Sequence, residues 1–443
     1  MNEKIALKVD ELKDQLVEMR RDFHRHAELS WMEFRTASIV VKKLRRLGYD
    51  VRYGAEVIKE EAMMGVPSPA VAEKARKRSL EQGADPEIVA NMVGCKTGVV
   101  AVLDTGKPGP VVGFRFDMDA NDLTEACDPK HRPCKEGFAS INEDAMHACG
   151  HDAHTTIGLG LAEVLAHIKT ELIGKVKLVF QPAEEGARGA KSMAEAGVVD
   201  DVDYMIGIHV GLSRNKVGEV ICGAGAEGFP ATTKIDVTFT GRSAHAGGAP
   251  EAGRNALLAA TAAVQNLYGI SRHSQGLTRI NVGTMVGGSG RNVIAAHAHM
   301  KIETRGANRE LNEYMRDRAY KILAGAAAMY DVQVDTTIMG EIIGGIPSRP
   351  LAEKIAEIAK LVPEITEPEV LGPFAYGGSE DYTYFMTRVQ ELGGQATCIV
   401  LGTELAAVHH NPYFDINEDV IPLGVKFLSE IALKLTTTMP QIR

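Results

Sequence analysis

The chain has 443 residues, of which 45% are hydrophobic and 24% are charged, and its net charge is −9. These values describe an ordinary globular protein, and the acidic balance argues against nucleic acid or an acidic membrane surface as a partner. The length exceeds what one hydrophobic core usually supports, so two domains are expected.

The first residues are charged and helical in pattern, without the apolar run of a secretory signal. No apolar stretch approaches the length of a membrane span. The six cysteines have no repeated spacing and do not predict a disulfide framework. We therefore expect a cytoplasmic protein with reduced cysteines and no membrane partner.

The chain begins with one or two amphipathic helices over residues 5–47, which end at Gly48. Residues 55–93 are polar and interrupted by prolines, and we expect them to lie outside the core. Beyond them come short apolar strands separated by helical segments such as 155–167; the strands are expected at 99–103, 111–116, 176–180, 204–209 and 397–401. This alternation predicts an α/β fold, a mixed sheet flanked by helices.

The middle of the chain has its own order of elements. Strands are expected at 234–240, 279–285, 299–304 and 332–338, and helices at 255–268 and 308–329. That order, βαββαβ, is a complete ferredoxin-like unit, and glycine-rich crossings bracket it. We therefore predict an inserted, hinged lid and dimerisation domain at 228–341, and a catalytic domain formed by 1–227 and 342–443.

Residues 146–154 bring three histidines, a cysteine and an aspartate together around Gly150. In an extended segment, side chains two positions apart point the same way, so Cys149 and His151 could bind one ion. Thiolate and imidazole are good ligands for zinc-like metals. The alternative is a purely structural histidine cluster. His147 and His154 are expected to support the ligands rather than to bind metal.

Other donor residues follow expected strands: Asp117 and Asp119, the pair Glu184-Glu185, His209, and the pair His409-His410. Ligands gather at the carboxyl ends of strands in α/β sheets, so these segments are expected to converge. Adjacent glutamates point in different directions, so one can bind a metal while the other acts as general base. The alternative for that pair is a solvated acidic surface. Spacing alone does not choose between His409 and His410.

His245 lies in a glycine-rich turn at 241–248, after the first strand of the predicted insert. The turn lacks the Gly-Lys-Ser/Thr ending of a phosphate loop and does not begin a helix. Nucleotide binding is therefore rejected for this segment.

Together these segments resemble the dinuclear metallopeptidases of the M-twenty family, the aminoacylase and carboxypeptidase-G kind. The similarity covers nearly the whole chain and is greatest to the amidohydrolase subgroup, in which a cysteine replaces the bridging aspartate. The motifs that carry it are RDFHRHAE at 21–28, FRFDMDA, MHACGHDAH, QPAEEG, GIHV, GRSAHAG, GRNVI, ETRG, GGSED and HHNP.

The resemblance implies a role for ten residues. The implied ligands of two divalent metal ions, manganese or zinc, are Cys149, His151, Glu185, His209 and His410. Glu184 matches the general base, Asp119 an aspartate that orients a ligating imidazole, and His245 a lid histidine that reaches across a dimer. Asn292 and Arg305 match positions that hold the substrate carboxylate. Ala27 and Asn121-Asp122 depart from the family pattern without replacing any implied ligand.

The resemblance also implies hydrolysis of an amide between an acyl or aroyl group and an amino acid, with p-aminobenzoyl-glutamate the expected substrate. Hydrolysis of N-acyl or indole-acetyl amino acids such as the aspartate conjugate is the alternative within this class. A non-catalytic subunit of a heteromeric hydrolase is the alternative of another class. We expect a homodimer through the lid or a heteromer with a paralogous subunit. A metal-storage or sensing protein would not need a hinged lid with a carboxylate-binding arginine.

Overall fold

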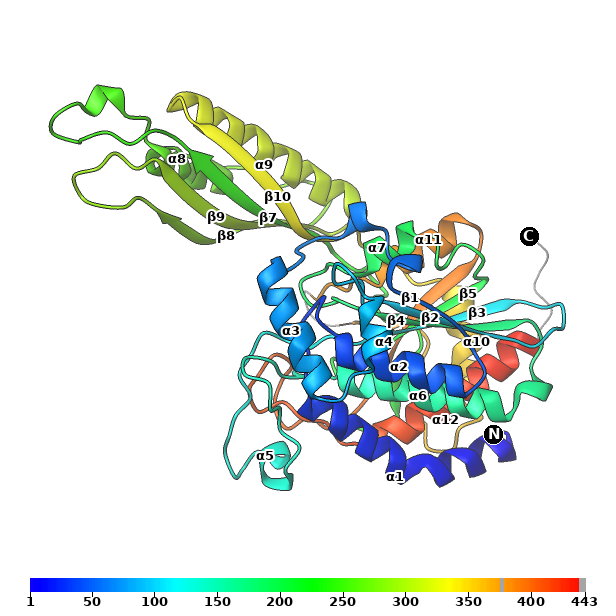
Figure 1. The fold of residues 1–443 in the computed structure, drawn as a ribbon. Helices are drawn as coiled ribbons and strands as arrows, with labels where there is room; N and C mark the ends of the chain where they lie inside the picture. The colour runs from blue at the N-terminus through cyan, green and yellow to red at the C-terminus, as the bar shows by residue number, and fades with distance from the viewer. Residues whose placement is uncertain (375–377, 438–443) are drawn as a thin grey trace. The chain divides into compact units, whose positions relative to one another are not determined.

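A computed structural model describes residues 1–374 and 378–437 of the chain (Figure 1). The GGSED motif therefore begins outside the described residues, at Gly377. The chain divides into two compact units, and the main segment of the second runs from Gly228 to Gly345. This segment ends slightly beyond the predicted position 341, because its last strand continues to Ile342. Nearly all of the remaining chain forms the first unit.

The first unit is built on one mixed sheet in the order β1-β2-β4-β3-β5-β12-β6-β11. The neighbours β4, β3, β5 and β12 run parallel, whereas β2 is antiparallel to β1 and to β4. The strands are β1 (Asp50–Tyr53), β2 (Val99–Asp104), β3 (Val111–Asp117), β4 (Lys175–Gln181), β5 (Tyr204–Val210), β6 (Glu219–Ile221), β11 (Glu367–Glu369) and β12 (Gln395–Leu401). All five strands predicted for this unit are present.

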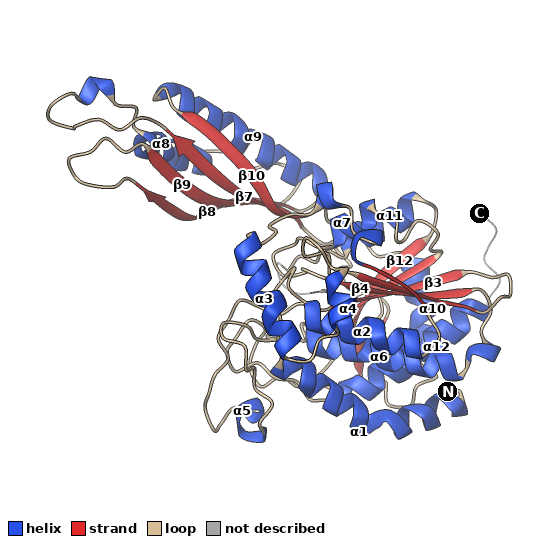
Figure 2. Cartoon of the chain, in the orientation of Figure 1, coloured by secondary structure: helices blue, strands red, loops and turns tan. Residues whose placement is uncertain are grey.

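Helices cover both faces of the sheet (Figure 2). Four of them pack together on one face: α1 (Glu3–Arg25), α2 (Phe34–Arg46), α6 (His151–His167) and α12 (Val420–Thr437). On the other face lie α7 (Ala190–Glu195) and α11 (Thr383–Glu391), and the unit also contains α10 (Arg349–Ala359). Because both faces are covered, the central strands are apolar runs that are buried almost throughout. The predicted α/β class is confirmed.

Helix α6 begins four residues before the predicted start, at His151. Gly150 precedes it in the left-handed conformation, with φ of 86°, which glycine adopts at little cost. A Cβ built on Gly150 would stand 2.5 Å from a methyl group of Val210 on β5. The extended conformation expected for Cys149 and His151 is therefore wrong: the two residues flank a glycine turn that starts a helix.

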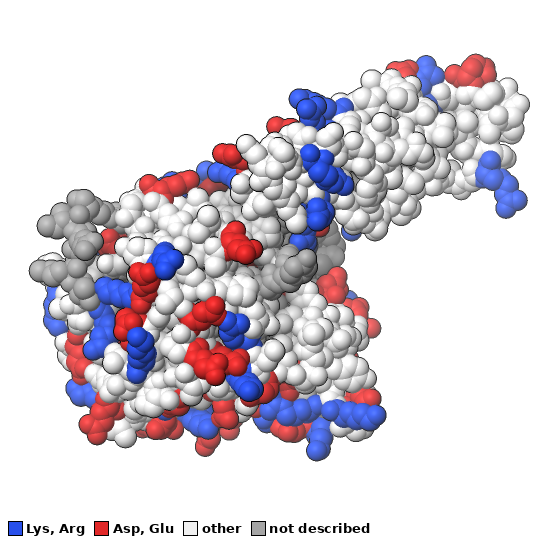
Figure 3. Space-filling view, turned by 180° about the vertical axis from the view of Figure 1, so that it is seen from behind, with Lys and Arg blue, Asp and Glu red and all other residues white. Residues whose placement is uncertain are grey.

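Residues 55–93, expected outside the core, form α3 (Pro69–Glu81) and α4 (Pro86–Ala90) beside α2. A further short helix, α5 (Arg132–Glu136), follows β3. Among the described residues, no helix is long and apolar enough to cross a membrane. On the face seen in Figure 3, acidic and basic side chains are interspersed.

The second unit has the predicted order of elements: β7 (Ala231–Thr240), α8 (Ala256–Tyr268), β8 (Thr278–Gly287), β9 (His297–Gly306), α9 (Arg309–Met329) and β10 (Gln333–Ile342). Its antiparallel sheet has the order β10-β7-β9-β8, the ferredoxin-like arrangement. The apolar faces of α8 and α9 meet alternate residues of the strands in a separate core. The chain enters β7 and leaves β10 at the same end of this sheet.

Candidate metal centre and substrate cavity

The loop after β4 holds the two glutamates. Its conformation is tight, since Ala183 has a φ of 53°, and the amide of Ala183 donates to the buried carboxylate of Glu33 at 2.8 Å. The Asp119 carboxylate accepts the amides of Glu184 and Glu185 at 3.0 and 2.9 Å. One buried carboxylate thus fixes the backbone of both glutamates.

Asp119 contacts both His151 and the glutamate loop. His151 Nδ1 donates to the backbone carbonyl of Asp119 at 2.8 Å, whereas the carboxylate lies 3.5 Å away. The carboxylate also accepts from the Ser30 hydroxyl at 2.6 Å. Asp119 orients the imidazole through its main chain and uses its side chain to hold the glutamate loop.

Cys149, His151 and His209 are buried with their donor atoms within 4.8 Å of one another. His209 Nε2 lies 3.5 Å from Cys149 Sγ, and its Nδ1 donates to the Val210 carbonyl at 2.9 Å. Burial lowers the pKa of His209 well below its usual value, so the ring is neutral and its Nε2 lone pair faces the thiol. A neutral imidazole held in this way is the form that binds metal.

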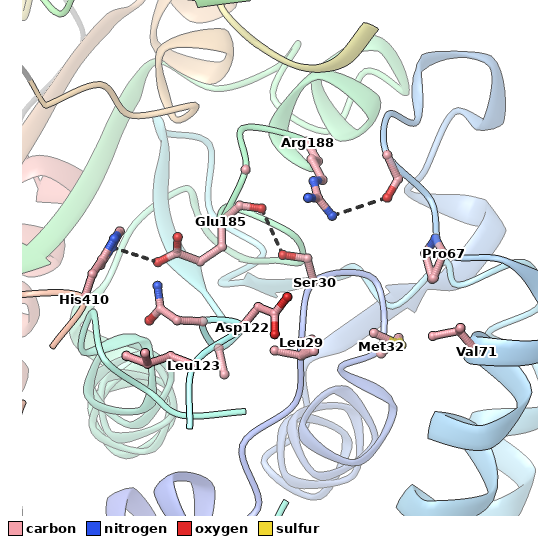
Figure 4. A pocket seen from close by; sticks show the side chains of 14 residues that line it. Leu29, Ser30, Met32, Pro67, Val71, Asp122, Leu123, Glu185, Arg188 and His410 are labelled. Atoms are coloured by element: carbon pink, nitrogen blue, oxygen red, sulfur yellow. Dashed lines mark hydrogen bonds and ion pairs between the residues drawn. The ribbon is translucent and has the colours of Figure 1, made fainter. Parts of the chain in front are cut away.

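A second set shares the same cysteine: Cys149, Glu185 and His410 also meet within 4.8 Å. His410 Nε2 lies 3.4 Å from Glu185 Oε1, and Figure 4 shows the two side chains facing each other. His409 instead contacts the Val210 carbonyl at 3.2 Å. The structure thus separates two neighbours that spacing could not distinguish.

Asp117 is a candidate donor to which the sequence analysis assigned no role. It is fully buried at the end of β3, and its donor atom lies within 4.8 Å of those of His151 and His154. Its carboxylate pairs with Arg115 at 2.6 Å and with His154 Nδ1 at 2.6 Å. His154 Nε2 accepts the Val210 amide at 2.9 Å, so both nitrogens of His154 are occupied within the protein. The expected supporting role fits His154.

Two buried atoms at the centre of this cluster form no hydrogen bond among the described residues: His151 Nε2, and Glu185 Oε1, whose contact with His410 is the ion pair at 3.4 Å. Burial lowers the pKa of His151, but Asp117 and the other neighbours raise it well above the usual value. The surroundings therefore favour a positive charge at this point. Burial also raises the pKa of the Cys149 thiol, so a bound cation is what would stabilise the thiolate. Thiol, imidazole and carboxylate around unsatisfied atoms fit divalent metal ions.

Next to this cluster is a cavity of about 550 Å³. Glu185 and His410 lie on one side of it, and apolar side chains form much of the remaining wall (Figure 4). The lining residues are Leu29, Ser30, Met32, Gly65, Pro67, Val71, Ala120, Asn121, Asp122, Leu123, Glu185, Gly186, Arg188 and His410. The segment 55–93 thus contributes a wall of the cavity, a role that its polar composition did not indicate.

The three site residues predicted in the second unit do not lie together. His245 and Asn292 are neighbours, since the amide of Ala246 donates to the Asn292 carbonyl at 2.9 Å. Arg305 pairs with Thr232 near the start of β7, at the opposite end of β9. A ten-residue strand such as β9 spans ~30 Å, so one copy of this unit does not place all three around one substrate.

The His245 side chain is exposed, and its Nδ1 accepts the amides of Gly247 and Gly248 at 3.1 and 2.9 Å. In the neutral ring the proton is then on Nε2, which is available as a donor. Arg305 is paired with Glu303 at 3.0 Å. A substrate carboxylate would therefore compete with this glutamate for the guanidinium.

Comparison with known proteins agrees with this site. The model of peptidase family M20/M25/M40 matches residues 113–434. The chain belongs to this family. Within it, the chain is 48% identical to one subunit of the p-aminobenzoyl-glutamate hydrolase of Escherichia coli, over 97% of this chain and 98% of that one. It is also 48% identical to indole-3-acetyl-aspartic acid hydrolase of Enterobacter agglomerans, over 96% and 97%.

One solved structure is similar over nearly the whole chain. The aminobenzoyl-glutamate utilization protein from Klebsiella pneumoniae superposes with a TM-score of 0.82 at 42% identity, covering 96% of this chain and 97% of that one. The resemblance inferred from the motifs is confirmed, and so is the predicted hydrolase class.

Proposed function

We propose that the protein is a metal-dependent amidohydrolase that cleaves conjugates of an aromatic acyl group with a dicarboxylic amino acid, p-aminobenzoyl-glutamate first among them. The observation that carries this proposal is the pair of donor sets that share Cys149 beside a cavity partly lined by apolar side chains. Two sets with a common thiolate suit two metal ions. The names of the two relatives at 48% identity point to such conjugates.

In the proposed site, Cys149, His151, Glu185, His209 and His410 hold the metal ions. The ions, when bound, supply an acidified water molecule and a polarised amide carbonyl. Glu184 takes the proton from the attacking water and delivers it to the leaving amine nitrogen. Asp119 keeps Glu184 in place through the backbone amide. His245 Nε2 donates to the developing oxyanion, and Asn292 and Arg305 bind the amino-acid carboxylate.

We propose a dimer in which the second unit of one copy completes the site of the other. The length of β9 separates His245 and Asn292 from Arg305 within one copy. In the proposed dimer, each site therefore receives Arg305 from one copy and His245 and Asn292 from the other. β8 lies at the edge of its sheet and exposes Met285 and Val286, a surface suited to pairing with a second chain. The Escherichia coli relative is named as one subunit of its hydrolase, which favours a further, paralogous subunit in the assembly.

We assign zinc or manganese to the site, since thiolate favours zinc and carboxylate with imidazole suits manganese. The chain itself is proposed to be catalytic rather than a silent subunit, because every residue of the proposed machinery is present. All six cysteines are free, which suits a reducing compartment, and we place the protein in the cytoplasm.

One preparation decides the function: metal content is measured, and the same sample is assayed with p-aminobenzoyl-glutamate, indole-acetyl-aspartate and N-acetyl amino acids. We expect two equivalents of metal per chain and the highest kcat/KM with a dicarboxylic conjugate. A purified, metal-loaded chain that cleaves none of these amides would support the silent-subunit alternative.

A further inference from the structure

Arg188 is a cation in the substrate cavity that the chemistry described so far does not use. Among the described residues that line the cavity it is the single arginine or lysine. It follows the glutamate loop directly, and its amide donates to the Ala183 carbonyl at 3.1 Å. The same tight loop that carries Glu184 and Glu185 therefore fixes the backbone of Arg188.

The guanidinium of Arg188 lies against Gly186. A Cβ built on Gly186 would stand 2.5 Å from Arg188 Nε and 3.0 Å from Cζ, so glycine leaves the room that this side chain occupies. Gly186 also has a φ of 89°, which favours glycine. Arg188 is thus held against Gly186, the residue that follows Glu185, on the wall of the cavity.

Arg188 is half-buried and has few hydrogen-bond partners among the described residues. Nη1 donates to the Gly65 carbonyl at 3.3 Å, a contact drawn in Figure 4. Nε is buried without a hydrogen-bond partner among the described residues, and no described carboxylate forms an ion pair with Arg188. A buried N–H without a partner is costly and is normally satisfied. A carboxylate in the cavity is the ligand best suited to the other N–H groups of this guanidinium, which can bind it through two parallel hydrogen bonds.

We propose that Arg188 binds the side-chain carboxylate of the amino-acid half of the substrate and so selects dicarboxylic conjugates. This inference rests on the proposed function and names the group that sets its specificity. The two relatives at 48% identity are named for different acyl groups, but glutamate and aspartate both carry a second carboxylate. In this assignment Arg305 and Asn292 keep their proposed role of binding the α-carboxylate.

The test compares two substrates of nearly equal shape, p-aminobenzoyl-glutamate and p-aminobenzoyl-glutamine, which differ in the side-chain charge. With Arg188→Met, we expect kcat/KM for the glutamate conjugate to fall roughly 10- to 100-fold, the usual effect of losing a charged hydrogen bond. The value for the glutamine conjugate should change by less than about 3-fold. Arg188→Lys should restore part of the preference for the glutamate conjugate, because lysine keeps the positive charge but lacks the planar guanidinium group.

The matched control is Arg349→Met, which removes one exposed positive charge on α10, where Arg349 pairs with Glu353. It should leave kcat/KM for both substrates unchanged. A second readout is the binding of both conjugates to Glu184→Gln protein, measured by calorimetry with and without the additional Arg188→Met substitution. Arg188→Met should weaken binding of the glutamate conjugate alone. Metal content and thermal unfolding of each variant show whether the site is intact.

An unchanged glutamate-to-glutamine ratio in Arg188→Met, in rate and in binding, would overturn the proposal, and so would an equal loss with both substrates. If the wild-type enzyme cleaves neither conjugate, it is the proposed function that fails. The ratio of the binding constants of the two conjugates, measured by calorimetry, then still decides whether Arg188 recognises the carboxylate.

Discussion

At the scale of single residues, the most direct point to test is the proposal that Glu184 is the general base and Glu185 a metal ligand. Glu184→Gln keeps the size of the side chain and removes its basicity. We expect kcat to fall by about 10²- to 10⁴-fold, the usual contribution of a general base, while metal content stays at the wild-type level. Glu195→Gln, an exposed residue paired with Lys59, is the control. A metal-loaded Glu184→Gln enzyme with normal turnover contradicts the assignment.

A second residue-scale prediction concerns His24, which is buried between Asp152 at 2.7 Å and Glu125 at 3.0 Å. Burial and Arg20 lower its pKa, but the two carboxylates outweigh them and raise it to about 8. Because the folded pKa exceeds the unfolded value of 6.5, the stabilisation is complete below pH 6.5 and is lost as the pH rises through about 8.

Urea unfolding of wild-type and His24→Asn protein at about pH 6 and about pH 9 measures this effect. The stability difference between the two proteins should shrink by about 2 kcal/mol at the higher pH. The subtraction removes pH effects that both proteins share. A difference that does not depend on pH would show that folding does not raise the pKa of His24.

Chemical type and position along the chain are enough to predict that Cys149, His151 and Glu185 meet. They are not enough where the answer depends on the direction of a side chain. His409 and His410 are adjacent, and only the turn at His410, with a φ of 61°, separates their directions. Asp117 and Asp119 stand two apart, but one pairs with Arg115 and His154 while the other holds the glutamate loop.

At the scale of elements, the start of α6 is the feature most sensitive to a small change. Gly150→Ala forces a Cβ into a left-handed position and against Val210. We expect a loss of about 1–3 kcal/mol of stability and weaker metal binding, since Cys149 and His151 flank the turn. Gly325→Ala in α9 is the control; open space surrounds that position, and the change should stabilise the helix by up to about 1 kcal/mol.

Thermal unfolding and metal titration of the two glycine variants check this prediction, and equal behaviour of both would contradict it.

The same turn shows where sequence reasoning fails at this scale. Apolar runs make the strands and the βαββαβ order predictable, because burial imposes those patterns. A helix start is set by one left-handed residue and its neighbours in space, so the sequence pattern predicts a start at Thr155 instead of His151.

At the scale of the whole molecule, a dimer with shared sites predicts complementation. Glu184→Gln and His245→Ala should each be nearly inactive alone. After the two are mixed and allowed to exchange subunits, a mixed dimer contains one intact site, so about a quarter of wild-type activity should return. Mixing Glu184→Gln with Cys149→Ser is the control, because both lesions then lie in the first unit and no site is intact. The absence of recovery in the first mixture would exclude the shared site.

The wall of the cavity that comes from residues 55–93 has a consequence for how such enzymes diverge. Gly65, Pro67 and Val71 touch the space for substrate, yet they belong to a surface segment that supplies none of the proposed metal ligands. Substitutions, insertions or deletions there can reshape the space for substrate while the segments that carry the proposed ligands stay as they are. A new substrate range is therefore accessible to evolution by small steps in one peripheral segment, without passing through an inactive ancestor.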